Sequence, residues 1–161
     1  MKKHRTSHYM AAKRILRYIN ETIELGLLYP TNSNEDEAEL VGFTDADWCR
    51  DKDDRKSTTS YVFMINNSPI SWCLKKQSIE ALSTCETEYV VASMATCQAI
   101  WLAELMTELR LRINKEVKLK INNKSKIDLA RHPSVHGRSK HIKTRFHFLR
   151  DQVMKDKINI N

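Results

Sequence analysis

Residues 70–93, ISWCLKKQSIEALSTCETEYVVAS, contain the change of pattern that decides the fold. The segment Ile70 to Leu74 is a short apolar run of the kind found in strands. From Thr84 to about Leu111 the chain has neither Pro nor Gly, and Ala, Leu, Glu and Met dominate. This composition predicts one long helix that follows directly on a strand.

The predicted helix carries small side chains along one stripe. Glu88, Ala92, Ala95 and Ala99 recur at helical spacing. Side chains three and four residues apart lie on the same face of a helix. We therefore expect this helix to lie close against a sheet.

Two runs upstream of the helix predict the remaining strands of an antiparallel meander. Residues 39–48, ELVGFTDADW, alternate between apolar and polar side chains, and residues 58–65, TTSYVFMI, are rich in β-branched and aromatic ones. The polar segment 66–69, NNSP, predicts the turn into the third strand at 70–74.

Downstream, residues 116–121, EVKLKI, alternate and predict a fourth strand. We expect a short helix over 125–131 and a longer one over 136–155, with Ile142, Phe146 and Leu149 turned inward. Residues 157–161, KININ, look like the start of a strand that does not extend. The resulting order, α–β–β–β–α–β–α–α–(β), is an α/β arrangement with a parallel fourth strand.

The N-terminal residues form a separate expected unit. Ser7 is a candidate cap for a helix that runs toward Gly26, a candidate stop. We predict a basic helical segment at 1–30 and a second domain at 39–161.

Length and composition exclude several classes of protein. The 161 residues are 41% hydrophobic and 29% charged, which is typical of one globular domain. No apolar run approaches the length needed to span a bilayer, and the first ten residues lack a secretory pattern. The four cysteines include no close pair, so we expect reduced thiols and a cytoplasmic or nuclear location.

Charge is unevenly distributed along the chain. The formal net charge is +7, yet residues 34–54 hold nine acidic side chains, and residues 110–161 hold fifteen basic against four acidic ones. A basic C-terminal third beside an acidic strand fits a phosphate-binding surface next to a cation site. A solvated basic surface with no partner is the alternative.

Two carboxylates suggest where that cation site lies. Asp45 falls inside a predicted strand, where an ionised side chain is unfavourable unless it is paired or binds a cation. Glu88 falls near the start of the long helix. If the helix crosses the sheet, the two carboxylates converge as part of a magnesium site.

The segments around these carboxylates resemble a known family. FTDADW at 43–48, DDRKSTTSYVF at 53–63, the stretch 70–93 and HGRSKHIKTRFHFLRD at 136–151 closely resemble the RNase H domain of copia-type retrotransposon polyproteins. The helix AAKRILRYI at 11–19 is similar to the tether that precedes this domain, so the resemblance covers residues 7–161.

The resemblance implies an RNase H-like mixed sheet with three antiparallel strands and a parallel fourth, flanked by helices. The fifth strand and last helix are expected to be missing or incomplete. It also implies hydrolysis of the RNA strand of a hybrid with two Mg²⁺ ions held by four carboxylates.

The family's first Asp falls on Asp45 and its Glu on Glu88, whereas its third carboxylate falls on Asn122, an amide. The fourth would lie beyond Asn161, and Lys143 replaces an Asp. Two carboxylates give −2 where the family has −4, so we expect Mg²⁺ binding to be weak or absent and catalysis to be impaired.

Nucleic-acid binding does not depend on the metal site, because phosphate contacts supply most of the affinity. The candidate contacts are basic side chains near the third strand and the late helix: Lys75, Lys76, His136, Arg138, Lys140, His141, Lys143 and Arg145. The expected ligand is an RNA–DNA hybrid or duplex RNA. The alternatives are a weakly active ribonuclease H that uses Asp45, Glu88 and Asn122, or a protein-interaction element whose exposed sheet flank binds a partner or a second copy.

Overall fold

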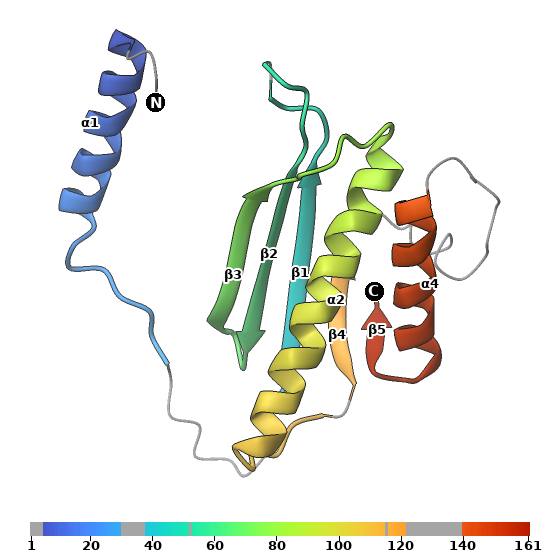
Figure 1. The fold of residues 1–161 in the computed structure, drawn as a ribbon. Helices are drawn as coiled ribbons and strands as arrows, with labels where there is room; N and C mark the ends of the chain where they lie inside the picture. Colours follow the sequence, from blue (N-terminus) through green and yellow to red (C-terminus); the bar gives the residue numbers. More distant parts are fainter. Residues whose placement is uncertain (1–4, 30–37, 52, 115, 122–139) are drawn as a thin grey trace. The chain divides into compact units, whose positions relative to one another are not determined.

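The computed structural model describes residues 5–29, 38–51, 53–114, 116–121 and 140–161, with only the backbone for 140 and 141. The chain divides into two compact units, residues 1–31 and 32–161. Each unit is described by itself (Figure 1).

The first unit contains one helix, α1 (Thr6–Glu21). Its N-cap is Arg5, which makes no side-chain capping bond, so the expectation that Ser7 caps this helix is wrong. The helix ends at Glu21, well before Gly26. The hydroxyl of the next residue, Thr22, donates a hydrogen bond to the Tyr18 carbonyl at 2.8 Å. No residue of α1 is buried within the unit.

The second unit is built on a five-stranded mixed sheet with the order β3-β2-β1-β4-β5. The strands are β1 (Leu40–Asp47), β2 (Thr58–Ile65), β3 (Ser68–Lys76), β4 (Val117–Ile121) and β5 (Ile158–Ile160). The first three pair antiparallel, and β4 runs parallel to β1. This is the predicted fold class.

A two-residue turn joins β2 to β3. Asn66 and Asn67 both have positive φ, at 45° and 69°, which suits the tight hairpin turns that match the twist of a sheet. The predicted turn included Ser68 and Pro69, which instead open β3. Proline is tolerated there because β3 is an edge strand.

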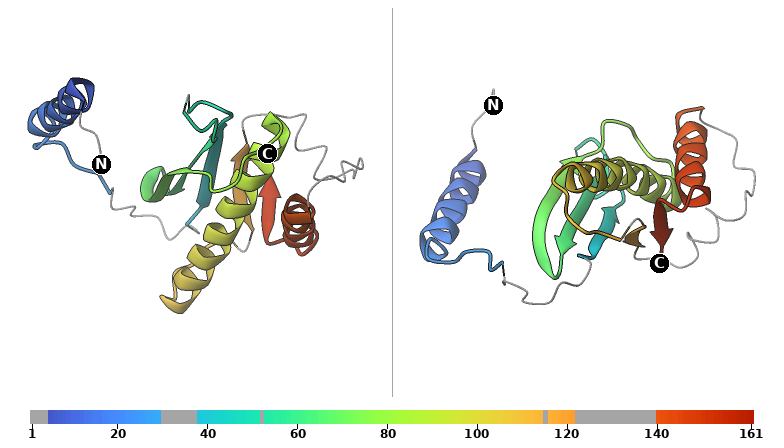
Figure 2. Two further views of the ribbon diagram at one scale, coloured as in Figure 1. Left: turned by 45° about the horizontal axis from the view of Figure 1, so that its top comes forward. Right: turned by 90° about the horizontal axis from the view of Figure 1, so that it is seen from below.

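The long helix α2 (Thr84–Glu108) lies over one face of the sheet, with α4 (Lys140–Met154) beside it (Figure 2). The predicted stripe of small residues is buried: Ala92 is 3% exposed, and Ala95 and Ala99 are fully buried. They join Phe63 and Leu119 in one hydrophobic core. Small side chains therefore let the helix lie close to the strands, as expected.

By length and composition alone, α2 is also apolar enough to cross a membrane. The expectation that no apolar run approaches the length needed to span a bilayer therefore overlooked this helix. Half of the apolar window is buried inside the domain, as in the core helix of a folded protein.

The expectation that the C-terminal residues do not complete a strand is wrong. They do form a strand: β5 pairs parallel with β4, with Val117 opposite Ile158 and Leu119 opposite Ile160. Ile158 and Ile160 are 1% and 5% exposed, so their burial stabilises a strand of only three residues. The edge of β4 is therefore covered, and it is not the open flank that we expected.

Candidate functional site

Asp45 lies near the C-terminal end of β1, opposite Ser60 of β2. Burial alternates along this strand: Leu40, Gly42 and Thr44 are buried, whereas Asp45 is exposed. Because successive side chains in a strand point to opposite faces, Asp45 lies on the face away from the buried core. The carboxylate is thus accessible at the surface.

Glu88 lies in the second turn of α2, whose start is fixed by a cap. The Ser83 hydroxyl accepts a hydrogen bond from the Glu86 backbone N–H at 3.2 Å, and the Glu86 carboxylate accepts one from the Leu82 N–H at 2.8 Å. The first bond satisfies a backbone donor that the first turn leaves open, and the second satisfies the backbone donor of the residue before the cap. The cap therefore sets the rotational position of Glu88 on the helix.

The Oε2 atom of Glu88 is buried. The side chain lines a small pocket between α2, α4 and the ends of β4 and β5, with Cys85, Tyr89, Ala92, Ile121, Leu149 and Ile160. Asp45 is not among the residues that line this pocket. The convergence of Asp45 with Glu88 therefore stays a prediction.

Tyr89 anchors this part of α2 against α4. Its ring packs edge-to-face on Phe146, with centroids 5.7 Å apart. Burial raises the pKa of the Tyr89 hydroxyl, and the nearby Cys85 thiol raises it further. The phenol thus stays neutral and serves as a packing group beside Glu88.

The parallel register relates β1 to the end of β4. Thr44 is the partner of Ile121. Asp45 follows Thr44 in the sequence, and Asn122 follows Ile121. Asn122 itself lies outside the described residues.

A buried polar network that sequence reasoning missed joins the strands to the start of α2. Gln77, 5% exposed, donates to Thr59 Oγ1 at 3.0 Å and to the Thr87 carbonyl at 3.2 Å. The Thr87 hydroxyl lies 3.2 Å from that of Ser57. No spacing in the sequence distinguishes Gln77 from the exposed lysines before it, because its burial depends on tertiary contacts.

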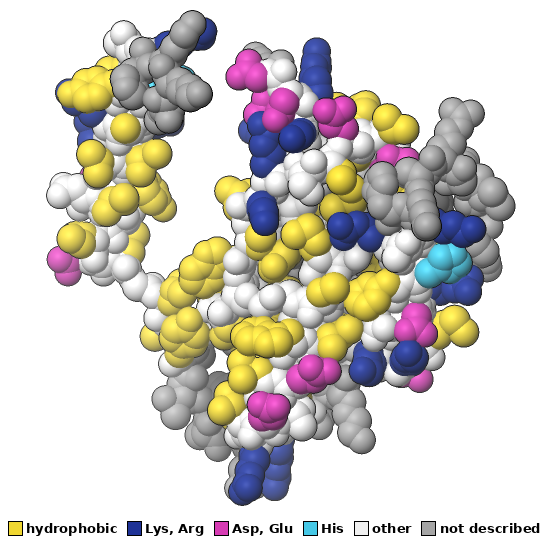
Figure 3. All heavy atoms as spheres, in the orientation of Figure 1, with side chains coloured by type: hydrophobic (Ala, Val, Ile, Leu, Met, Phe, Trp, Pro, Cys, Tyr) yellow, Lys and Arg dark blue, Asp and Glu magenta, His cyan; other side chains and the backbone are white. Residues whose placement is uncertain are grey.

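Lys76 is engaged with the loop that follows β1. Its ammonium contacts Asp51 at 2.5 Å and Asp54 at 2.9 Å. The hydrogen bond from Lys76, with those from the backbone of Asp53 and Asp54, lowers the pKa of Asp51 to about 2. Acidic and basic side chains intermingle over this loop at the top of Figure 3. Lys76 is therefore neutralised locally, although it is exposed like its neighbour Lys75.

The other binding candidates are only partly described. Lys143 is exposed and Arg145 is half-buried on α4, and Lys140 and His141 are helical in backbone. His136 and Arg138 lie outside the described residues. On the sheet, the Lys120 ammonium lies 5.1 Å from the centroid of the Phe43 ring.

Within the described ranges, no group of three or more His, Cys, Asp or Glu side chains is placed to hold a metal ion. Mg²⁺ prefers several oxygen ligands in octahedral geometry. Asp45 and Glu88 alone do not fit a site for two such ions.

No protein-family model matches the chain. The chain is 37% identical over 153 residues to the retrovirus-related Pol polyprotein from transposon TNT 1-94 of Nicotiana tabacum and 34% identical to that from transposon RE1 of Arabidopsis thaliana. Each match covers 95% of this chain, which spans about a tenth of those relatives: 11% and 10%. A 96-residue stretch, 60% of the chain, is 44% identical to secreted RxLR effector protein 161 of Plasmopara viticola and covers 66% of it.

Solved structures share the fold at low identity. LC11-RNase H1 matches 76% of this chain and 82% of its own, with a TM-score of 0.55 and 10% identity; its complex with an RNA/DNA hybrid matches at 0.53. The foamy viral protease-reverse transcriptase in complex with dsDNA matches 99% of this chain and 29% of its own, with a TM-score of 0.65 and 15% identity.

The strand order, the parallel β1–β4 pairing and these likenesses define an RNase H-like α/β domain. Within that class, the chain is homologous to a segment of the retrovirus-related Pol polyproteins from copia-type transposons, and its fold is consistent with an RNase H domain of such a polyprotein. The family resemblance found in the sequence is confirmed.

Proposed function

We propose that this RNase H-like domain binds nucleic acid, as an RNA–DNA hybrid or duplex RNA, and that its hydrolytic activity is impaired. A shared fold with a protein solved on an RNA/DNA hybrid supports the ligand class. The net charge of +7 supports it independently.

Binding rests on basic side chains that can reach phosphate. Lys75, Lys120 and Lys143 are exposed in the described part of the chain. Phosphate contacts position a protein on a duplex without reading its sequence. They also make affinity fall steeply with salt. Recognition of an A-like duplex would then follow from its shape and backbone.

The observation that carries the proposal of impaired hydrolysis is the Thr44–Ile121 register. This register pairs the residues that precede Asp45 and Asn122. The end of β1, which carries the first carboxylate, therefore lies beside the end of β4, after which the next residue in the sequence is an amide. An amide oxygen can ligate a cation but adds no negative charge. With Asp45 and Glu88, the site supplies −2, too little to hold two close divalent ions against their mutual repulsion.

A labelled RNA–DNA hybrid tests both halves of the proposal in the same samples. Cleavage would be measured with Mg²⁺ and with Mn²⁺, and binding by fluorescence anisotropy, for the natural chain and for Asp45→Ala. We expect binding that weakens as salt is raised. We expect no cleavage that is lost in Asp45→Ala. Cleavage lost in Asp45→Ala would overturn the impaired chemistry, and absence of binding would overturn the ligand class.

The binding surface can be tested by charge removal. Replacing Arg138, Lys140 and Arg145 together by Gln is expected to reduce the slope of log affinity against log salt by about 2–3, since each lost phosphate contact contributes about 0.7–0.9. A matched control neutralises Arg110, Arg112 and Lys157, three exposed cations around other turns of the domain. Equal slopes for the two triple variants would contradict the assignment of the binding surface to Arg138, Lys140 and Arg145.

A second candidate function is favoured by the face of the sheet away from the core. On β3, Trp72 and Leu74 are 66% and 78% exposed, and in β1 Phe43 is 37% exposed. Such a surface suits a protein partner or a homodimer. Concentration-dependent association without salt-sensitive RNA binding would support this function over the first.

A further inference from the structure

The helix of the first unit has a hydrophobic face. Its apolar side chains recur three and four residues apart, so they form one stripe along α1: Tyr9, Ala12, Ile15, Leu16 and Ile19. All of them are exposed. Figure 3 shows hydrophobic side chains along the length of this helix. Since no residue of α1 is buried, the stripe is open from end to end.

The basic side chains of α1 lie on another face. Lys13 and Arg17 are one turn apart, and Arg14 precedes Arg17 by three residues. All three are exposed. Residues 1–20 contain six Lys and Arg side chains and no Asp or Glu. The stripe is therefore accompanied by positive charge that no acidic neighbour in this segment offsets.

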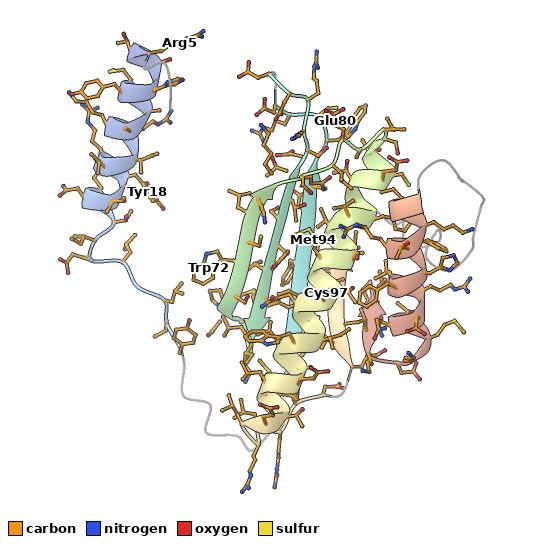
Figure 4. The ribbon with its side chains drawn as sticks, viewed as in Figure 1. Arg5, Tyr18, Trp72, Glu80, Met94 and Cys97 are labelled. Atoms are coloured by element: carbon orange, nitrogen blue, oxygen red, sulfur yellow. The ribbon has the colours of Figure 1, made fainter. Side chains whose placement is uncertain are left out.

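Tyrosines mark the borders between the two faces. The Lys13 ammonium lies 4.7 Å from the centroid of the Tyr9 ring. Tyr18 follows Ile15 by three residues and lies at the other border; Figure 4 shows Arg5 and Tyr18 at opposite ends of the helix. Tyrosine and lysine have an apolar body and a polar end, so they suit the boundary between an apolar phase and water.

The charge and the stripe together define the partner. A second copy of this helix is disfavoured, because two segments with six uncompensated cations repel each other. Nucleic acid would contact the basic face but leave the stripe in water. The surface of an anionic bilayer accepts both faces, and basic amphipathic helices of this kind typically lie in that interface.

The hydrophobic surface also continues past the end of the helix. Ile23, Leu25 and Leu27 are each more than half exposed, although α1 ends at Glu21. A groove on a protein takes up the regularly spaced anchors of one helical face. A bilayer interface takes up apolar side chains from the helix and from the segment that follows it. This continuity favours lipid over an acidic protein groove.

We propose that α1 lies on the surface of a bilayer that contains anionic lipid. The stripe enters the boundary between headgroups and acyl chains, and Lys13, Arg14 and Arg17 contact the anionic headgroups. The 16 residues of α1 extend for about 24 Å, less than the hydrocarbon core of about 30 Å, so the helix lies on the bilayer and does not span it. This site is independent of the proposed nucleic-acid binding, because none of the candidate contacts lies in α1.

The test measures co-sedimentation of the full chain with phosphatidylcholine vesicles that either contain or lack phosphatidylserine. We expect binding to the mixed vesicles that weakens as salt is raised, and little binding to phosphatidylcholine alone. Replacing Lys13, Arg14 and Arg17 together by Gln should weaken binding on the order of 100-fold, because each cation near an anionic surface contributes about fivefold. The matched control replaces three exposed cations of the second unit by Gln and should bind like the natural chain: Arg110, Arg112 and Lys157.

A second variant removes the stripe and keeps the charge. Leu16→Ser with Ile19→Ser should weaken binding by about tenfold or more, because two large apolar side chains are lost from the interface. Trp72→Ser with Leu74→Ser, at exposed apolar positions of β3, is the control that should bind like the natural chain. Circular dichroism checks that every variant is folded.

Four results would overturn the proposal. Equal binding to both kinds of vesicle would show that the charge plays no part. Undiminished binding of the stripe variant would reduce the interaction to the general attraction of a basic protein. Equal losses in the two triple Gln variants would place the contact outside α1. Self-association that depends on the stripe, without sedimentation on mixed vesicles, would assign the stripe to a second copy.

Discussion

Thr44 and Ile121 are register partners in the parallel pairing of β1 with β4. Their pairing is the geometric basis for comparing Asp45 with Asn122, the residues that follow them in the sequence. The ends of adjacent parallel strands are where α/β proteins most often place functional side chains. This relationship leads directly to the first prediction.

Replacing Asn122 by Asp should strengthen Mg²⁺ binding by about tenfold or more, because a carboxylate adds a negative charge that the amide lacks. Isothermal titration with Mg²⁺ would measure the change. The same substitution combined with Asp45→Asn is the control, and it should lose the gain. An unchanged affinity in Asn122→Asp would mean that position 122 does not share a site with Asp45.

Gly42→Ala should destabilise the second unit by about 2–3 kcal/mol, because a Cβ there would lie 2.5 Å from Phe63 Cε1 and 2.8 Å from Leu119 Cδ1. Both neighbours are fully buried and have little room to move. Gly26→Ala is the matched control, since no atom lies within 4 Å of its Cβ. Urea unfolding would compare the two, and equal midpoints would contradict the packing at Gly42.

Ser83→Ala should lower stability by about 1 kcal/mol, because the Glu86 N–H loses its acceptor at the N-terminus of α2. Ser83→Asp should keep most of the stability that Ser83→Ala loses, because Asp is also a good N-cap. Chemical denaturation of the three proteins measures both effects. A loss that Asp fails to restore would show that the hydroxyl acts in some way other than capping.

Lys76→Met should raise the pKa of Asp51 from about 2 toward its ordinary value of 3.8, because the Lys76 hydrogen bond is the largest cause of the shift. A carboxyl whose pKa is lowered by folding stabilises the fold above its unfolded pKa and loses that effect as pH falls toward 2. The loop contact should therefore persist at pH 4 and weaken toward pH 2. Carboxyl titration by NMR checks this, with Lys75→Met as the control that leaves Asp51 unchanged.

The sequence predicted the architecture well where its signals are local. The run of β-branched and aromatic residues at 58–65 became β2 with the same bounds, and the stripe Ala92, Ala95, Ala99 became the contact of α2 with the sheet. Prediction from the sequence failed where tertiary contacts determine the secondary structure. The three residues of β5 are too few to show a strand pattern, and they are ordered by pairing with β4.

The candidate site could be predicted only in part. The segments around Asp45 and Glu88 made both residues candidates, but no pattern could place one relative to the other across the sheet. The burial of Gln77 and the pairing of Lys76 with Asp51 depend on a loop that returns to the end of β3. Contacts of this kind have no periodicity, so they become visible only in three dimensions.

The two-residue turn at Asn66 and Asn67 has a consequence for the order in which the domain assembles. The β2–β3 hairpin joins residues that are close in the sequence, so its loop closes with little loss of entropy and can form within microseconds. The β1–β4 pairing must instead bring together residues separated by the hairpin and the whole of α2. Contacts of such long sequence separation slow folding. The hairpin should therefore appear first in time-resolved hydrogen exchange, and the strand end that carries Asp45 should acquire its neighbour on β4 last.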